Sequence, residues 1–151
     1  MITMKQITDY FRTEELVCPH VFERFGHAAL DFFDKDLLAV LLFIRQGLNR
    51  PIYVNNWAWG GDKSQRGLRC NCCALVKEKT ALEKPYLSAH LFGKGIDFHV
   101  QGMTAEEVRQ WIAQNAAYLP CKIRVESGVS WVHVDVSAYG MSAAQITYFT
   151  E

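Results

Sequence analysis

The sequence predicts an α+β fold, a single domain in which helices pack on one face of a largely antiparallel sheet. One apolar segment repeats with the period of a helix, and three others alternate with the period of a strand. The chain of 151 residues is half apolar, which suits one hydrophobic core and is too short for two ordinary domains. We therefore expect one domain over residues 1–151, with a central region at 52–137 supported by a helical first 50 residues.

Two helices are indicated by their ends as well as by their apolar period. Residues 34–45 begin with Asp34 at the N-cap and are followed by a Gly, an Asn and a Pro, which predicts a buried helix. A second helix begins at Thr104, which forms a capping box with Glu107. We expect Pro120 to stop this helix.

The strands are predicted from alternation and from turn residues. A short strand at 52–55 precedes a long irregular segment at 56–87, and such long loops in small domains are usually functional. A strand follows at 95–100, and residues 122–126 and 130–136 form a hairpin. The apolar positions of these strands belong to the core.

The opposite face of the same strands carries titratable side chains. Asp97 and His99 share one face of their strand, and His133 and Asp135 share one face of the last. Glu126 lies on the matching face of the hairpin partner. If these titratable side chains lie on the same side of the sheet, they form a polar site on the face away from the helices.

Composition and charge exclude several classes of partner. Sixteen basic residues balance sixteen acidic residues, so the chain has no general field for nucleic acid or for an anionic membrane. The N-terminus shows no signal peptide, and the apolar run at 37–44 is too short to span a bilayer. We therefore expect a monomer that is cytoplasmic at synthesis, without nucleic acid or membrane partners.

The five cysteines favour a reducing compartment, because an odd number without an export signal points to free thiols. The cluster at residues 70–73, together with Cys18 and His20, suggests a second, thiolate metal site. It lacks the paired C-x-x-C spacing of structural zinc sites, so we interpret these residues as buried free thiols.

A catalytic zinc site needs three protein ligands drawn from imidazole and carboxylate groups, and one position open to water. His90, Asp97 and His133 meet this need. Gly93 and Gly95 lie between the first two and allow the chain to reverse sharply. We expect one zinc ion per chain at these three residues.

The residues around these ligands resemble a known family. Residues 88–97 read SAHLFGKGID and resemble the S-x-H-x-x-G-x-A-x-D signature of zinc D-Ala-D-Ala carboxypeptidases and dipeptidases, with Gly95 in place of the Ala. Residues 131–135 read WVHVD and resemble the second motif, W-x-H-x-D. Hedgehog signalling domains and several phage endolysins share this fold. The resemblance implies that His90, Asp97 and His133 are the zinc ligands.

The same resemblance suggests further catalytic residues. Residues 64–66, SQR, are similar to the family's S-G-Y-R segment, which implies that Arg66 binds substrate or developing charge, with Arg69 as an alternative. Many members carry a Glu three residues before the last His ligand, but this chain has Ser130. Glu126 is our candidate for the general base. Asp135 is a fallback base or a residue that orients a ligand, and His99 is a further fallback.

The function implied by the resemblance is that of a zinc metallopeptidase, a hydrolase whose substrate is a peptidoglycan stem peptide or cross-link. Without a signal peptide, the chain resembles either a phage endolysin, which reaches the cell wall through host lysis, or a cytoplasmic dipeptidase of the vancomycin-resistance kind. We favour an endolysin of carboxypeptidase or endopeptidase activity. The alternative is a non-catalytic, hedgehog-like zinc domain that acts as a binding module, because Ser130 replaces the expected Glu.

Overall fold

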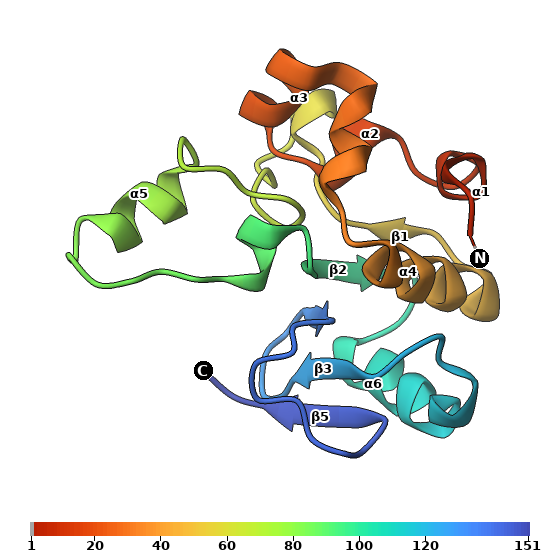
Figure 1. The fold of residues 1–151 in the computed structure, drawn as a ribbon. Coiled ribbons are helices and arrows are strands. Elements are labelled where there is room, and N and C mark those ends of the chain that lie inside the picture. Colours follow the sequence, from red (N-terminus) through yellow and green to blue (C-terminus); the bar gives the residue numbers. More distant parts are fainter. Residues whose placement is uncertain (1) are drawn as a thin grey trace.

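The computed structural model describes residues 2–151, and it confirms the α+β class. A five-stranded sheet has the order β1-β2-β4-β3-β5, and helices surround it (Figure 1). All neighbouring strands are antiparallel except β3 and β5, which are parallel. None of the helices in the described residues is both long and apolar enough to span a membrane.

The helices gather in the first half of the chain. The α-helices are α1 (Met4–Thr8), α2 (Thr13–Leu16), α3 (Pro19–Phe25), α4 (Lys35–Leu48), α5 (Ala74–Thr80) and α6 (Ala105–Gln114). Short 3-10 helices are η1 (Gly26–Phe32), η2 (Trp57–Trp59), η3 (Ala89–Phe92) and η4 (Ala116–Tyr118). The first 50 residues are thus helical, as the sequence predicts.

The predicted helix starts are confirmed, but α6 ends at Gln114 and not at Pro120, because Asn115 leaves the helical conformation. The side chain of Asp34 accepts a hydrogen bond from the Asp36 N–H at the start of α4, as expected of an N-cap. Thr104 accepts from the Glu107 N–H at the start of α6. The return bond from Glu107 to Thr104 is not made, so only half of the predicted capping box forms.

The strands are β1 (Ile52–Tyr53), β2 (Gly95–Val100), β3 (Ile123–Glu126), β4 (Val132–Asp135) and β5 (Ile146–Phe149). The prediction of a strand at 52–55 is correct only for its first half. Val54 and Asn55 leave the ladder, because Asn55 donates its backbone N–H to Glu15 at the end of α2. The strand β5 is not among the predicted elements.

The long segment predicted as irregular, residues 56–87, contains η2 and α5, so the prediction of a continuous loop is wrong. The part around α5 projects to one side of the molecule, while η2 lies against α2 (Figure 1). Val76 anchors α5 by burial against the core. The rest of α5 is mostly exposed, which explains why no strong apolar period marks it in the sequence.

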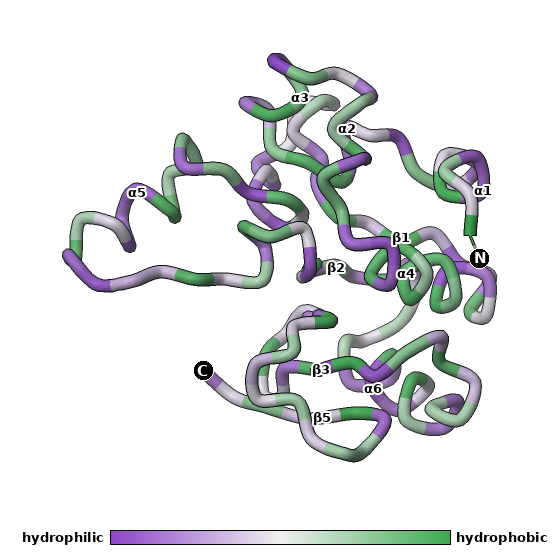
Figure 2. The backbone as a smooth tube through the Cα atoms, in the orientation of Figure 1, coloured by the Kyte–Doolittle hydropathy of each residue, from purple (hydrophilic) through white to green (hydrophobic). Residues whose placement is uncertain are grey.

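The core lies under the inner face of the sheet. Hydrophobic residues recur along α4 (Figure 2), where six positions are buried, and α6 packs against β2 and β4. The predicted inward positions of the central strands are almost completely buried: Ile96, Phe98, Ile123, Val125, Val132 and Val134. This continuous apolar layer holds the alternate positions of the same strands on the opposite face.

Candidate metal centre

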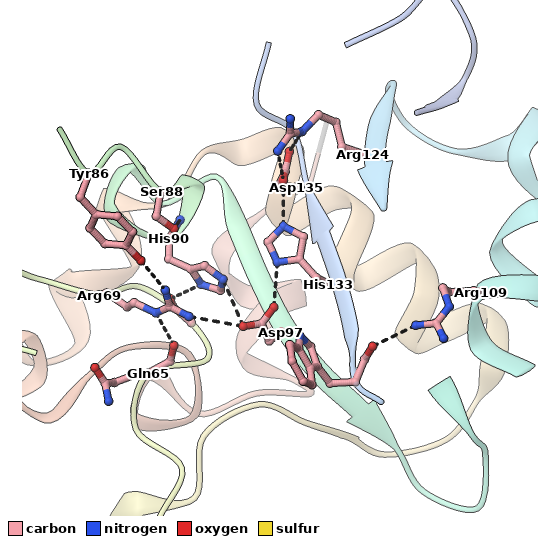
Figure 3. Close-up of polar contacts among 12 residues, drawn as sticks. Gln65, Arg69, Tyr86, Ser88, His90, Asp97, Arg109, Arg124, His133 and Asp135 are labelled. Carbon is pink, nitrogen blue, oxygen red and sulfur yellow. Dashed lines mark hydrogen bonds and ion pairs between the residues drawn. The ribbon is translucent and has the colours of Figure 1, made fainter. Parts of the chain in front are cut away.

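Three side chains that the sequence singles out converge at one point. The potential ligand atoms of His90, Asp97 and His133 all lie within 4.8 Å of one another. Asp97 lies between the two imidazoles (Figure 3), with Oδ2 3.2 Å from His90 Nε2 and Oδ1 2.7 Å from His133 Nδ1. All three residues are buried. The arrangement is that of a compact set of two nitrogen ligands and one oxygen ligand.

The backbone explains this convergence. Asp97 in β2 and His133 in β4 are direct partners across the antiparallel ladder, so their side chains leave the same face side by side. His90 comes from η3, which ends at Gly93 with a φ of 66°. A Cβ at Gly93 would collide with the Phe32 carbonyl, so this turn requires glycine. A Cβ at Gly95 would lie only 2.8 Å from Ala89 Cβ, which favours glycine at this position.

Each imidazole is oriented by a partner on its outer nitrogen. His90 Nδ1 donates to the Gly67 carbonyl at 2.9 Å, which leaves Nε2 as the free lone pair toward Asp97. His133 Nε2 lies 2.8 Å from Asp135 Oδ2, so Nδ1 faces the centre. Metal-bound histidines almost always donate their other nitrogen to a carboxylate or a carbonyl. Both histidines have this support.

The spacing of the three groups fits zinc. Ligand atoms at about 2.05 Å from a tetrahedral ion lie roughly 3.3 Å apart. The separation of 3.2 Å between Asp97 and His90 is close to this value, and the separation of 2.7 Å between Asp97 and His133 is shorter by about 0.6 Å. A small outward shift of His133 would complete the fit. The donor set also matches the two histidines and one carboxylate of many catalytic zinc sites.

The charges at the centre are strongly coupled. Burial lowers the pKa of His90, which is therefore neutral at pH 7. Burial also opposes the charge on His133, but hydrogen bonds to Asp135 and Asp97 raise its pKa to about 9. The pKa of Asp97 stays well below its usual value, since bonds from the histidines outweigh the effect of burial. In the metal-free protein, a positive imidazolium thus lies between two carboxylates, where a cation is favoured.

This coupling predicts how the stability of the metal-free protein depends on pH. The pKa of His133 is about 9 in the folded protein and 6.5 ordinarily, so its contribution is complete below pH 6.5. The contribution is lost as the pH rises through 9. We expect the Tm in excess chelator to fall from pH 6.5 to 9, and His133→Asn to flatten this fall. A Tm that rises over this interval in the wild type would contradict the assignment.

Asp135 lies behind His133 and away from the other two ligand residues. It is completely buried, and Arg124 holds it with two bonds of 2.9 Å and 3.1 Å. Burial raises the pKa of such a carboxyl group, but bonds from His133 and Arg124 lower it overall. This geometry favours the second of the two roles that the sequence suggests for Asp135, which is to orient His133.

Asp135→Asn tests this orienting role. The amide retains the shape but removes the charge that holds the His133 Nε2–H, so zinc affinity should fall by roughly 10 to 100-fold. Competition titration with a chromophoric chelator measures this change. Unchanged affinity would show that Asp135 does not support the ligand.

Glu126 is close to the centre but makes no side-chain hydrogen bond within residues 2–151. It follows Val125, whose ladder partner is Val134, so the register brings Glu126 beside His133. Burial raises the pKa of Glu126, while His133 partly opposes the shift. Neither carboxylate oxygen is completely enclosed. A raised pKa and an unused carboxylate are properties of a general base.

A cleft of about 380 Å³ opens beside Asp97. Its lining contains the polar or aromatic side chains Lys63, Arg66, Asp97, His99, Ser130 and Trp131. The Arg66 guanidinium donates to the Val54 carbonyl and lies 3.0 Å from His99 Nδ1. Lys63 and Arg66 thus place two positive charges in the cleft beside Asp97, where a substrate carboxylate can bind.

Arg69, the alternative to Arg66, lies at the centre itself. Its Nη2 is 3.5 Å from Asp97 Oδ2, and its Nη1 donates to the Tyr86 hydroxyl at 3.1 Å. The sequence leaves the choice between the two arginines open, and both reach the site from the same segment. Arg66 lies in the cleft, whereas Arg69 holds a ligand residue.

Three supporting groups are not predicted from the sequence. They are the Gly67 carbonyl, the Arg124 side chain and the ring of Phe149 in β5. Phe149 packs edge-on against His133 and lies under the Arg124 guanidinium. Only Arg124 carries a sequence signal, since it shares a strand face with Glu126.

Comparison of the chain with protein-family models, curated proteins and solved structures found no match.

Proposed function

We propose that this protein is a zinc-dependent peptidase that hydrolyses an amide bond in bacterial peptidoglycan stem peptides or cross-links. The observation that carries the proposal is the convergence of His90, Asp97 and His133, of which Asp97 lines an open cleft. The resemblance of residues 88–97 and 131–135 to zinc D-Ala-D-Ala peptidases supports the same assignment. We assign one catalytic zinc to these three residues.

Zinc at this position polarises a scissile carbonyl and lowers the pKa of water, which is the chemistry that amide hydrolysis needs. The chain's own residues supply the rest. Glu126 accepts a proton from the attacking water and returns it to the leaving amine. Arg66 binds a substrate carboxylate from the cleft wall, and Asp135 keeps His133 in the binding orientation.

The features of the cleft suit a short peptide with a free carboxylate. Arg66 and Lys63 provide positive charge, and Trp131 provides an apolar wall. A stem peptide that ends in D-alanine carries such a carboxylate next to a small methyl group. The volume of about 380 Å³ suits a few residues rather than a folded protein. We place the activity in cell-wall degradation of the phage endolysin type.

Purified peptidoglycan tests this function directly. Incubation with the zinc-loaded protein should release peptide fragments that mass spectrometry identifies, and a chelator should stop the release. The masses also show which bond is cut and whether attack is internal or terminal. Release of neither peptide fragments nor free D-alanine by the zinc-loaded, folded protein would disprove the peptidase proposal.

A non-catalytic, hedgehog-like zinc domain is the second candidate. One observation favours it: Ser130 lines the cleft at the position where many of the peptidases carry their Glu. In that case the metal stabilises a binding surface and hydrolysis is not expected. Zinc bound at full stoichiometry with no fragment release would favour this second candidate.

A further inference from the structure

A second group of potential metal ligands lies outside the centre described above. It brings together two parts of the chain that are about fifty residues apart, and its ligand atoms lie within 4.8 Å of one another: Cys18, His20, Cys70 and Cys73. The interpretation of these cysteines as buried free thiols is correct in that none forms a disulfide, but Cys70 is only partly buried. Cys72 is exposed, and the other three are gathered with a histidine.

The sequence spacing of the group is in part that of a structural zinc site. Cys70 and Cys73 form one C-x-x-C pair. The sequence contains no second C-x-x-C pair, so the sequence pattern alone does not reveal the site. Cys18 and His20 take the place of a second pair, with Cys18 at the N-cap of α3 and His20 in its first turn.

The distances fit a tetrahedral ion. Sulfur atoms at about 2.3 Å from zinc lie roughly 3.8 Å apart, and a sulfur and a nitrogen lie roughly 3.6 Å apart. Cys18 Sγ is 3.7 Å from Cys70 Sγ, and Cys73 Sγ is 3.9 Å from His20 Nδ1. The sulfur separation is far above the roughly 2.05 Å of a disulfide bond.

Two backbone N–H groups also point at sulfur atoms of the group, which favours a negative charge on them. The Cys72 N–H points at Cys70 Sγ from 3.3 Å, and the Cys70 N–H points at Cys73 Sγ from 3.4 Å. Hydrogen bonds of this kind favour a thiolate over a thiol. Three thiolates packed together without a cation would repel one another strongly, and a divalent ion removes this repulsion.

We propose that Cys18, His20, Cys70 and Cys73 bind a second zinc ion in a closed, structural site. Three thiols lose their protons to solvent when the ion binds, and the four side chains leave no position for water. The ion enters from a surface cavity of about 340 Å³ that His20, Cys72 and Cys73 help to line. The site revises the expectation of one zinc per chain to two.

The second ion would hold the segment that supports the first centre. Leu68 bonds to the backbone on both sides of Val17, through the Leu16 carbonyl at 2.8 Å and the Cys18 N–H at 3.0 Å. Gly67, the residue before it, accepts the bond from His90. The next residue, Arg69, contacts Asp97. The zinc would thus anchor the N-terminal helices to residues 67–69, which contact His90 and Asp97.

Metal analysis of the full chain tests the proposal. Mass spectrometry of the zinc-loaded protein under native conditions should give two zinc ions per chain. Cys73→Ser should lose one, His133→Ala should lose the other, and the matched neighbour variant Cys72→Ser should retain both. A Cys72→Ser variant that loses an ion, or a folded Cys73→Ser variant that retains both, would overturn the assignment.

Cobalt provides a measurement that needs no variant at this site. The Co²⁺-loaded wild type should show strong thiolate-to-cobalt charge-transfer absorption, and His133→Ala should retain it. If only the metal site at His133 fails, this absorption persists while the second cobalt ion is missing, and if only the hydrolysis fails, both cobalt ions bind and no fragment is released. Absence of the absorption in the fully loaded, reduced wild type, or a Cys18–Cys70 disulfide in the protein prepared under reducing conditions, would overturn the second site.

Discussion

Asp97→Ala is expected to weaken zinc binding at the catalytic centre by about 10²- to 10³-fold and to remove peptidase activity. Each ligand contributes roughly 3 kcal/mol if a total of 10–16 kcal/mol is shared among the ligands of a zinc site. Asp97 also separates the two histidines, and its loss leaves the positive His133 facing His90 with Asp135 as its remaining counter-charge. Competition with a chelator measures the affinity, and fragment release from peptidoglycan measures the activity.

His99→Ala is the matched control, because His99 lies on the same face of β2 two residues along and outside the ligand group. It should retain the metal affinity of the wild type. Any change in its activity reports on the cleft and on Arg66. Equal metal affinity in Asp97→Ala and His99→Ala would remove Asp97 from the centre.

Glu126→Gln is expected to lower turnover by about 10²-fold or more while zinc stays bound. The amide retains the size of the side chain but cannot accept a proton. Burial raises the pKa of Glu126, so the wild-type carboxylate is a stronger base than an exposed glutamate. The variant should also lose the acidic limb of the pH–rate profile.

Asp135→Asn separates this role from that of a supporting carboxylate. Glu126→Gln should change the rate with metal affinity intact, whereas Asp135→Asn should change metal affinity and activity together. Wild-type hydrolysis in Glu126→Gln, combined with a zinc-loaded but inactive Asp135→Asn, would transfer the role of base to Asp135.

The local elements could be predicted from the sequence because their signals are local. The apolar period and the Asp34 cap identify α4, and alternation identifies β2 and the β3–β4 hairpin. The same alternation places Asp97 and His133 on polar faces. Asp97 and His133 are paired because β2 and β4 form an antiparallel ladder with their apolar positions in the core. The two residues could therefore be proposed as ligands from the sequence.

Contacts between segments that are far apart in the sequence are seen only in the tertiary structure. The strand β5 joins β3 in parallel, and its Phe149 packs on His133 and Arg124, although no local pattern names its partner. The thiol site depends on Leu68 pairing with Val17, which brings together cysteines separated by about fifty residues. A sequence pattern reports the period of one segment, while contacts between distant segments depend on how the whole core packs. The polar faces that carry Asp97 and His133 were therefore open to prediction, and the groups that contact these residues were not.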